Sequence, residues 1–207
     1  MGQATGRRAK LGNFLADKCT FRLLTRELIA TCKPFSCGYD DLDEYFLKDS
    51  PLWADQMYGK TYCFVLKDDP QTIVCAFSLS NETIRVDLLP NSQKKRFLKE
   101  IPKEKRMRRY PAVLIGRLGV DVQFSNNGIG TELMQILKFW FIEPDNKAAV
   151  RYLAVDALNN TRTLNYYEKN GFAYLFKDEE QEAVSSKMKL PLKTRYMYFD
   201  LIEVIRK

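Results

Sequence analysis

The feature that most constrains the fold is an apolar strand, a glycine-rich turn and an amphipathic helix in direct succession. Residues 111–120 read PAVLIGRLGV, and glycines inside a strand mark a bulge or a close backbone approach. Residues 126–131 read NNGIGT. Beyond this turn, apolar side chains recur at helical spacing until Pro144, on one face that holds Ile129, Leu133, Ile136 and Trp140. Such a unit predicts a mixed α/β or α+β domain.

The rest of the chain shows no linker and no internal repeat that would divide it. We therefore expect a loose arm or an opening helix over residues 1–20 and a single domain over 21–207. Further helices are expected from Asp40 or Asp41 onward and from Thr161 to Asn170, the latter stopped by Gly171. The expected strands cover residues 21–31, 61–66, 72–79, 151–157, 172–177 and 194–202, the second and third forming a hairpin.

Histidine is absent from all 207 residues. Its absence removes Ser-His-Asp and Cys-His nucleophilic machinery, His-ligated zinc and every proton shuttle based on imidazole. Acid–base chemistry in this chain must use carboxylates, Tyr, Cys, Lys or water. We expect no metal site.

The composition is typical of a soluble protein of the cell interior. No apolar run approaches the ~20 residues that cross a bilayer, and no apolar stretch follows the basic N-terminus as in a secretory signal. The odd number of cysteines, without a C-x-x-C pair, fits neither a disulfide framework nor a cysteine zinc site. These five residues are Cys19, Cys32, Cys37, Cys63 and Cys75. We expect reduced thiols, a cytoplasmic location and no membrane association.

One short segment carries the whole charge imbalance. The net charge is +7, and residues 94–109 (KKRFLKEIPKEKRMRR) hold nine basic and two acidic residues, so the other 24 basic and 24 acidic residues cancel. The segment is either a solvated basic helix and loop, broken at Pro102, or a surface for nucleic acid or another polyanion. The candidate phosphate contacts are Lys94, Lys95, Arg96, Lys103, Lys105, Arg106, Arg108 and Arg109.

The glycine turn at 126–131 has the chemistry of an anion site. Glycines let successive N–H groups point one way, and the helix N-terminus behind them adds its positive dipole. It is not a Walker loop, because no Gly-Lys-Ser/Thr follows, and it is not a dinucleotide fingerprint, because Leu133 occupies the third glycine position. The alternative interpretation is a tight turn into a helix.

Two blocks of residues resemble the acetyl-CoA site of the GNAT N-acetyltransferase superfamily. The first is Leu118-Gly119-Val120-Asp121 with SNNGIG at 125–130, similar to the family's Arg/Gln-x-x-Gly-x-Gly/Ala at the mouth of a helix. The second is Asn160 with YEKNGF at 167–172, similar to the family's Asn and Tyr-Glu-Lys-x-Gly-Phe. The resemblance covers most of the chain from Phe21 onward. It implies acetyl transfer from acetyl-CoA to a primary amine on a mixed, mostly antiparallel sheet that is splayed at a bulge and flanked by helices.

The resemblance also implies the residues that bind the co-substrate. The strand near Leu118 and Val120 would pair with the pantetheine amides, with a bulge near Gly119 that separates it from the next strand. The whole implied set is Leu118, Gly119, Val120, Ser125, Asn126, Asn127, Gly128, Ile129, Gly130, Thr131 and Asn160. Ser125 departs from the family, which has Arg or Gln there. The pyrophosphate would lose a long side-chain contact, so we expect weaker acetyl-CoA binding.

Tyr167 is the implied general acid, which protonates the thiolate of CoA as it leaves. A phenol with a pKa near ~10 is close enough to a thiol at ~8.5 to give up its proton at that moment. Most of the rate should come from holding the amine and the thioester together. A packed aromatic before a helix end is the alternative for Tyr167, and Tyr166 points elsewhere on the helix.

A more specific resemblance concerns the acceptor. FSCG at 35–38, Leu42-Asp43, Phe46-Leu47 and LIGRLGVD at 114–121 look like the toxin-type GNAT enzymes that acetylate aminoacyl-tRNA and pair with a DNA-binding antitoxin. The implied partners are tRNA, an antitoxin protein and a second copy in a homodimer. An α-amine with a pKa near ~8 needs little help from a base, which agrees with the absence of an identifiable general base.

Two other functions remain open at this point. The chain could be a GNAT enzyme acting on a small amine, a peptide N-terminus or a protein lysine. It could also be a GNAT-like module that binds nucleic acid or protein without turnover, which the Ser125 departure favours and the retained Tyr167 and Asn160 disfavour.

Overall fold

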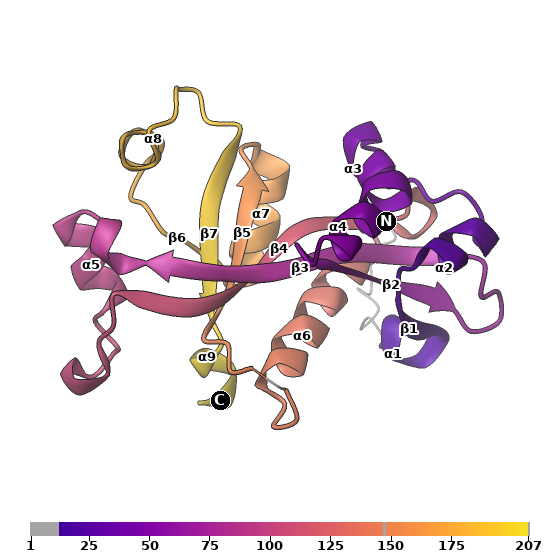
Figure 1. Cartoon of the computed structure of the whole chain (residues 1–207), viewed down its shortest axis with the longest axis horizontal. Helices are drawn as coiled ribbons and strands as arrows, with labels where there is room; N and C mark the ends of the chain where they lie inside the picture. The colour runs from indigo at the N-terminus through magenta and orange to yellow at the C-terminus, as the bar shows by residue number, and fades with distance from the viewer. Residues whose placement is uncertain (1–12, 147, 207) are drawn as a thin grey trace, which may run out of the picture.

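The computed structural model describes residues 13–146 and 148–206. Seven strands form one sheet in the order β1-β2-β3-β4-β5-β7-β6, with helices on both faces (Figure 1). Neighbouring strands are antiparallel except for β4 and β5, which are parallel. The mixed, mostly antiparallel sheet flanked by helices confirms the expected fold class.

The strands are β1 (Cys19–Leu23), β2 (Lys60–Leu66), β3 (Ile73–Arg85), β4 (Arg109–Val120), β5 (Tyr152–Leu158), β6 (Ala173–Tyr174) and β7 (Thr194–Asp200). The α-helices are α1 (Phe14–Lys18), α2 (Arg26–Thr31), α3 (Asp40–Glu44), α4 (Ser50–Asp55), α5 (Asn91–Phe97), α6 (Ile129–Ile142), α7 (Thr161–Lys169), α8 (Glu179–Ser186) and α9 (Ile202–Ile205). A π-helical turn, η1 (Tyr45–Asp49), joins α3 to α4. Three 3-10 turns are η2 (Val86–Leu88), η3 (Lys103–Lys105) and η4 (Val122–Phe124).

The motif strand and the two helices of the motif blocks form as predicted. The hairpin also forms, but β3 continues six residues beyond the predicted end at Leu79, to Arg85. The short helix α1 lies inside the expected N-terminal arm, and residues 1–12 of that arm lie outside the described residues. Gly171 follows α7 with a positive φ of 84°, a backbone conformation that glycine adopts without strain.

Two predicted strands are wrong in their extent. The expected strand 21–31 ends at Leu23, because the Thr25 side chain accepts a hydrogen bond from the Leu28 N–H and starts α2. The expected strand 172–177 is reduced to Ala173–Tyr174, and the unpredicted helix α8 follows it. Asp178 caps α8 by accepting from the Gln181 N–H at 2.8 Å. Both helices are short and begin at a polar capping residue, which was the available sequence signal.

The parallel strands β4 and β5 separate soon after they meet. Only Ala112–Leu114 of β4 pairs with Tyr152–Ala154 of β5, and beyond these residues the two strands diverge. The register between β3 and β4 shifts between Ser78 and Leu79, which leaves Gly116 as the extra residue on β4. The bulge therefore lies at Gly116, whereas the resemblance implied a bulge near Gly119.

Gly119 has a different role from a bulge. A Cβ at this position would lie 3.0 Å from the Cβ of Cys37 and 3.1 Å from the ring of Phe46. The missing side chain lets the segment before α3 and the turn η1 pack directly on β4.

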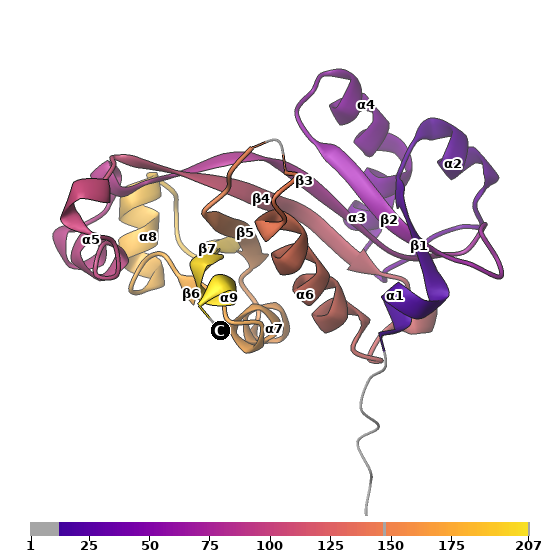
Figure 2. The ribbon, with the colours of Figure 1, turned by 90° about the horizontal axis from the view of Figure 1, so that it is seen from below.

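The core is divided by the sheet (Figure 2). On one face, α6 and α7 cover a cluster that includes Leu133, Leu137, Val155 and Tyr167. On the opposite face, α5 covers one cluster around Phe97 and Tyr152, while α2, α3 and η1 cover another around Phe46. We refer to these two surfaces as the α6/α7 face and the opposite face.

Candidate active site

The turn before α6 presents backbone N–H groups to solvent. Asn126 and Gly128 have positive φ angles of 62° and 78°, so the backbone reverses before the helix starts at Ile129. Among the described residues, no side chain caps this helix N-terminus. Asn126, Asn127 and Thr131 are exposed. Unpaired N–H groups and the helix dipole make the turn suited to an anion such as a diphosphate.

Gly130 is the contact point between the turn and α7. The Tyr166 hydroxyl donates a hydrogen bond to the Gly130 carbonyl oxygen at 2.6 Å. A Cβ on Gly130 would lie 3.2 Å from the Tyr166 ring, so a larger residue would push the two apart. Tyr166 is therefore engaged in holding the turn, in line with the prediction that it is the weaker candidate for the general acid.

Tyr167 is buried on the α6/α7 face. Its ring lies 5.0 Å from that of Tyr166 and 5.3 Å from that of Phe172, centroid to centroid. Burial raises the pKa of its phenol, with no hydrogen bond among the causes. The group therefore keeps its proton at neutral pH, which a proton donor requires. Burial also makes it a weaker acid than a phenol in water, so proton transfer needs an equally buried thiolate as acceptor.

The predicted pantetheine strand has an open edge at the right place. Leu118 and Val120 are half-buried and pack against the core of the α6/α7 face. On one side they pair with Phe77 and Cys75 of β3, and on the other side β5 has already diverged. The backbone of β4 beyond Leu114 thus faces a gap in the sheet.

Two predicted co-substrate residues have local hydrogen bonds. The Asn160 side chain accepts from the Thr163 N–H at 2.9 Å and caps α7, which leaves its amide nitrogen unused by that bond. The Ser125 hydroxyl donates to the Val122 carbonyl oxygen at 3.0 Å, back toward η4. A serine side chain in this geometry is too short to make the pyrophosphate contact expected of the family's Arg or Gln.

The opposite face contributes a carboxylate that the sequence analysis missed. In β5, the side chains of Leu153, Val155 and Ala157 belong to the core of the α6/α7 face, whereas Tyr152 and Ala154 belong to the other core. Asp156 alternates with the first set and therefore lies on the opposite face, just beyond the last residue that pairs with β4. A carboxylate inside the otherwise apolar strand YLAVDAL was the signal that could have identified it.

The surroundings of Asp156 are polar and charged. Its side chain is accessible, yet it lies among packed neighbours that raise the pKa of its carboxyl, mainly by removing water and further through Glu82 and Glu182. Arg117 lowers that pKa but does not cancel the rise. Tyr196, the neighbour of Asp156 on β7, has its phenol pKa raised first by burial and then by Glu82 and Asp156.

The basic segment is exposed but not uniformly available. Arg96 donates to the carbonyl oxygens of Tyr174 and Leu175, and Arg106 donates to those of Ile101 and Leu98. These two guanidinium groups hold local backbone. The other predicted cations are exposed and make no hydrogen bond or ion pair with another described residue: Lys94, Lys95, Lys103, Lys105, Arg108 and Arg109.

The five cysteines are free thiols, as expected. Burial raises the pKa of Cys19 to about 11 and that of Cys63 to about 12. Burial, followed by Asp43, raises the pKa of Cys37 to about 12. The thiols of Cys32 and Cys75 also have raised pKa values because of burial. None is set up as a thiolate nucleophile.

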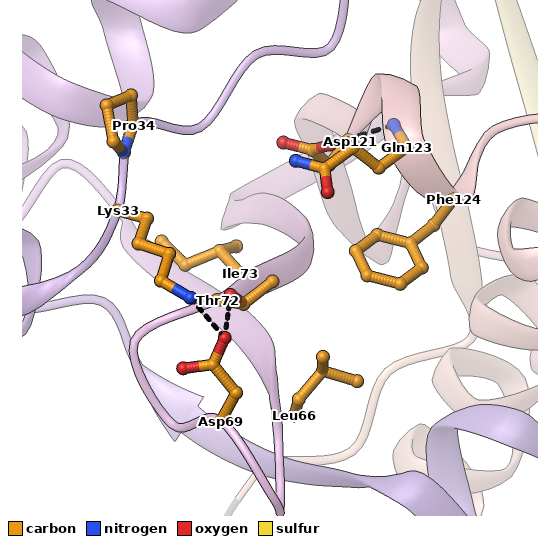
Figure 3. Close-up of a pocket in the computed structure, with 9 residues that line it drawn as sticks. All are labelled: Lys33, Pro34, Leu66, Asp69, Thr72, Ile73, Asp121, Gln123 and Phe124. Atoms are coloured by element: carbon orange, nitrogen blue, oxygen red, sulfur yellow. Dashed lines mark hydrogen bonds and ion pairs between the residues drawn. The ribbon is translucent and has the colours of Figure 1, made fainter.

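Two cavities lie away from the divergence of β4 and β5. One of about 200 Å³ is lined by the hairpin between β2 and β3, by residues 33–34 and by η4 (Figure 3). It contains the Lys33–Asp69 ion pair, with 2.5 Å between Nζ and Oδ2 (Figure 3). The other, of about 310 Å³, lies between the end of α6, residues 148–151 and α9. Neither includes Tyr167, Asp156 or the turn before α6.

The geometry agrees with the comparison to known families. The profile of the acetyltransferase (GNAT) family matches residues 25–172. The chain belongs to the GNAT family. It is therefore an acetyltransferase with acetyl-CoA as its co-substrate, and the strand, turn and helices described above are the parts that the two motif blocks indicated. In residues 13–146 and 148–206, no helix has the length and apolar character to cross a membrane, and no group of three Cys, Asp or Glu side chains could hold a metal ion.

Solved structures of similar fold include several toxins. The chain is similar to AtaT in its complex with acetyl-methionyl-tRNAfMet, with 18% identity, a TM-score of 0.63 and coverage of 91% of this chain and 99% of that one. It is also similar to AtaTR bound to AcCoA, with 18% identity, a TM-score of 0.63 and coverage of 92% and 99%. A Tyr-to-Phe mutant of KacT gives 17% identity, a TM-score of 0.64 and coverage of 92% and 99%.

Proposed function

We propose that this GNAT enzyme acetylates the α-amine of an aminoacyl-tRNA. The observation that carries the proposal is the position of the basic segment. The helix α5 packs through Phe97 and Leu98 on the opposite face, in the same cluster as Ala154 of β5. Lys94 and Lys95 of this helix therefore lie on the side from which an acceptor would approach the gap between β4 and β5. The similar fold of AtaT, solved with acetyl-methionyl-tRNAfMet, supports the same acceptor.

In the proposed reaction the two faces have separate tasks. The turn at 125–131 and the open edge of β4 hold acetyl-CoA, and Asn160 adds an amide nitrogen at the start of α7. Tyr167 donates its proton to the sulfur as the carbon–sulfur bond breaks. Fixing amine and thioester in the gap supplies the largest part of the acceleration, since well-placed reactants gain the equivalent of ~7–11 kcal/mol.

The proposed partners follow from the same neighbours. AtaT has been solved with the C-terminus of the antitoxin AtaR, and KacTA has been solved with DNA. We propose that this chain also has an antitoxin partner and forms a homodimer, and that one domain over residues 21–207 carries the activity. We further propose a cytoplasmic location, where free thiols stay reduced and charged tRNA is present.

The test is transfer of labelled acetyl groups from acetyl-CoA. Three acceptors are compared: charged tRNA, deacylated tRNA and a lysine-rich peptide. Label on charged tRNA alone supports the proposal. Label on the peptide alone, or equal label on charged and deacylated tRNA, contradicts it while leaving the GNAT assignment intact.

A further inference from the structure

We propose that Asp156 is the general base that takes the proton from the acceptor amine. The inference rests on the proposed function and adds a catalytic residue to it. The argument starts from the register of the sheet. Leu114 and Ala154 are the last paired residues of β4 and β5, and Asp156 is the next side chain of β5 on the opposite face. Its carboxylate therefore lies where the gap in the sheet opens.

The acid and the base lie on two sides of the same strand. Tyr167 packs in the cluster that contains Val155 and Ala157, on the α6/α7 face. Asp156 lies between these two residues in sequence and so projects to the other face. A thioester held in the gap can meet the phenol from one side while an amine approaches from the side of Asp156. Attack and departure then take place on opposite sides of the carbonyl carbon.

Asp156 is available for this role, whereas its acidic neighbour Glu182 is not. Glu182 accepts hydrogen bonds from Arg195 at 2.7 Å and from the Tyr196 N–H at 2.6 Å. No hydrogen bond or ion pair joins the Asp156 side chain to another described residue. The carboxylate is thus not needed to hold the fold, and it is free to bind an ammonium group.

The remaining groups near Asp156 favour a cationic acceptor. Glu82 of β3 is near enough to raise the pKa of Asp156, and its own contact is a hydrogen bond that it accepts from the Thr83 N–H. Arg117 of β4 is the opposing charge, but its guanidinium lies 5.2 Å from the centroid of the Tyr45 ring and donates to the Gly116 carbonyl oxygen. The local excess of negative charge attracts an ammonium group and stabilises it until it is deprotonated.

The proposed proton movements balance. The ammonium group first loses one proton to Asp156, which releases it to water. The neutral nitrogen then attacks the carbonyl carbon, the carbon–nitrogen bond forms, and nitrogen loses a second proton to Asp156, which releases this proton to water as well. The carbon–sulfur bond breaks, the sulfur takes the proton of Tyr167, and solvent restores the phenol. The sum is one amide, one CoA thiol and one proton released per amine.

The chemistry indicates which amines such a base can use. An α-ammonium group with a pKa of ~8 is far easier to deprotonate by a carboxylate than a lysine side chain at ~10.4. A carboxylate whose own pKa is raised by its surroundings is a better base than one in water. The inferred acceptor class is therefore an α-amine.

The test uses Asp156→Asn in the full chain, with charged tRNA as acceptor. We expect kcat/KM to fall about 100-fold, within the ~10²–10⁴ range of general-base catalysis, and the rise of activity with pH to lose its carboxylate-dependent limb. Asp156→Glu should retain part of the activity and should retain the carboxylate-dependent rise of activity with pH. Acetyl-CoA affinity, measured by calorimetry, should not change in either variant.

Glu82→Gln is a second variant of the same site. It removes a neighbouring negative charge that helps to raise the pKa of Asp156, so the Asp156 limb should move to lower pH. If wild-type enzyme acetylates charged tRNA and Asp156→Asn keeps both rate and pH profile, the base assignment is wrong and the proposed function stands. If wild-type enzyme uses another amine, the proposed function fails, and the same variants measured with that amine decide the base. Absence of turnover with every amine contradicts both.

Discussion

The two faces of the sheet at the gap between β4 and β5 are built in different ways. The α6/α7 face draws its parts from two continuous segments, residues 118–131 and 160–172, and most of its contacts with substrate would be made by backbone. The opposite face draws single side chains from separate strands: Glu82, Arg117, Asp156 and Tyr196. The first arrangement leaves a motif in the sequence, and the second does not. This difference separates recognition of a shared co-substrate from recognition of a particular acceptor.

After Asp156→Asn, the largest loss of activity is expected from a substitution of Tyr167. Tyr167→Phe removes the proton donor while keeping the ring, so kcat should fall about 100-fold. Acetyl-CoA affinity should stay unchanged, because the ring still packs. Tyr166→Phe is the matched control on the same helix. It loses only the hydrogen bond to Gly130, which is worth about 1 kcal/mol, and turnover should fall no more than several-fold. An equal loss of turnover in the two variants would contradict the assignment of Tyr167 as the acid and Tyr166 as the residue that holds the turn.

Charge reversal on the basic segment tests its role in binding tRNA. Replacing Lys103, Lys105, Arg108 and Arg109 by Glu should weaken tRNA binding more than tenfold and flatten its dependence on salt, since each lost phosphate contact lowers the slope of log K against log salt by about 0.9. The control is reversal of the exposed Lys18 in α1 and Arg22 in β1, because these two elements lie at the end of the molecule opposite to α5 (Figure 1). Arg96 and Arg106 are left intact because they hold backbone. Binding that ignores salt in the wild type would contradict the polyanion role.

Ser125→Arg tests how the side chain at position 125 affects acetyl-CoA binding. A guanidinium at this position should reach the pyrophosphate and tighten acetyl-CoA binding about tenfold, the effect of one hydrogen bond to a charged group. Ser125→Ala, the control, loses only the bond to Val122 and should leave the affinity unchanged. Calorimetry measures both. A wild-type dissociation constant above the millimolar range would mean that the backbone turn alone does not hold the co-substrate.

The smallest expected effect is on stability. Because the folded-state pKa of Asp156 is raised above its unfolded value, the ionised side chain destabilises the fold at neutral pH. This destabilisation is lost as pH falls through the raised pKa toward the unfolded value near ~4. Asp156→Asn should therefore melt at the same temperature as wild type or slightly above it at pH 7, with the difference disappearing toward pH 4. A clear loss of melting temperature in this variant would indicate a structural role for the carboxylate.

Local signals in the sequence predicted most of the fold and the two motif blocks of the candidate site. The hairpin, β4, α6 and α7 have long periodic patterns or a glycine stop, and they appear where expected. The short helices α2 and α8 were missed, because two turns of helix have too few residues for a period and are defined by caps at Thr25 and Asp178. The bulge was predicted near Gly119 and lies at Gly116, because the sequence of a strand with two glycines does not indicate which glycine is left unpaired by the neighbouring strand.

The role of Asp156 could not be predicted for a different reason, although a carboxylate inside an apolar strand marked the residue itself. Its role depends on where β5 stops pairing with β4, and that point is set by long-range register rather than by neighbours in sequence. The structural role of Arg96 had the same origin, since this side chain bonds to carbonyl groups 78 and 79 residues away.

The hydrogen bond from Tyr166 to Gly130 has a consequence for how the two ends of acetyl-CoA are coordinated. It joins the turn that would hold the diphosphate to the helix that carries the neighbouring Tyr167, so the two cannot shift independently. Binding of the diphosphate at the turn then fixes the position of the thioester relative to Tyr167. An acyl donor that lacks the nucleotide end would enter the gap, but its thioester would not be held at a fixed distance from the phenol.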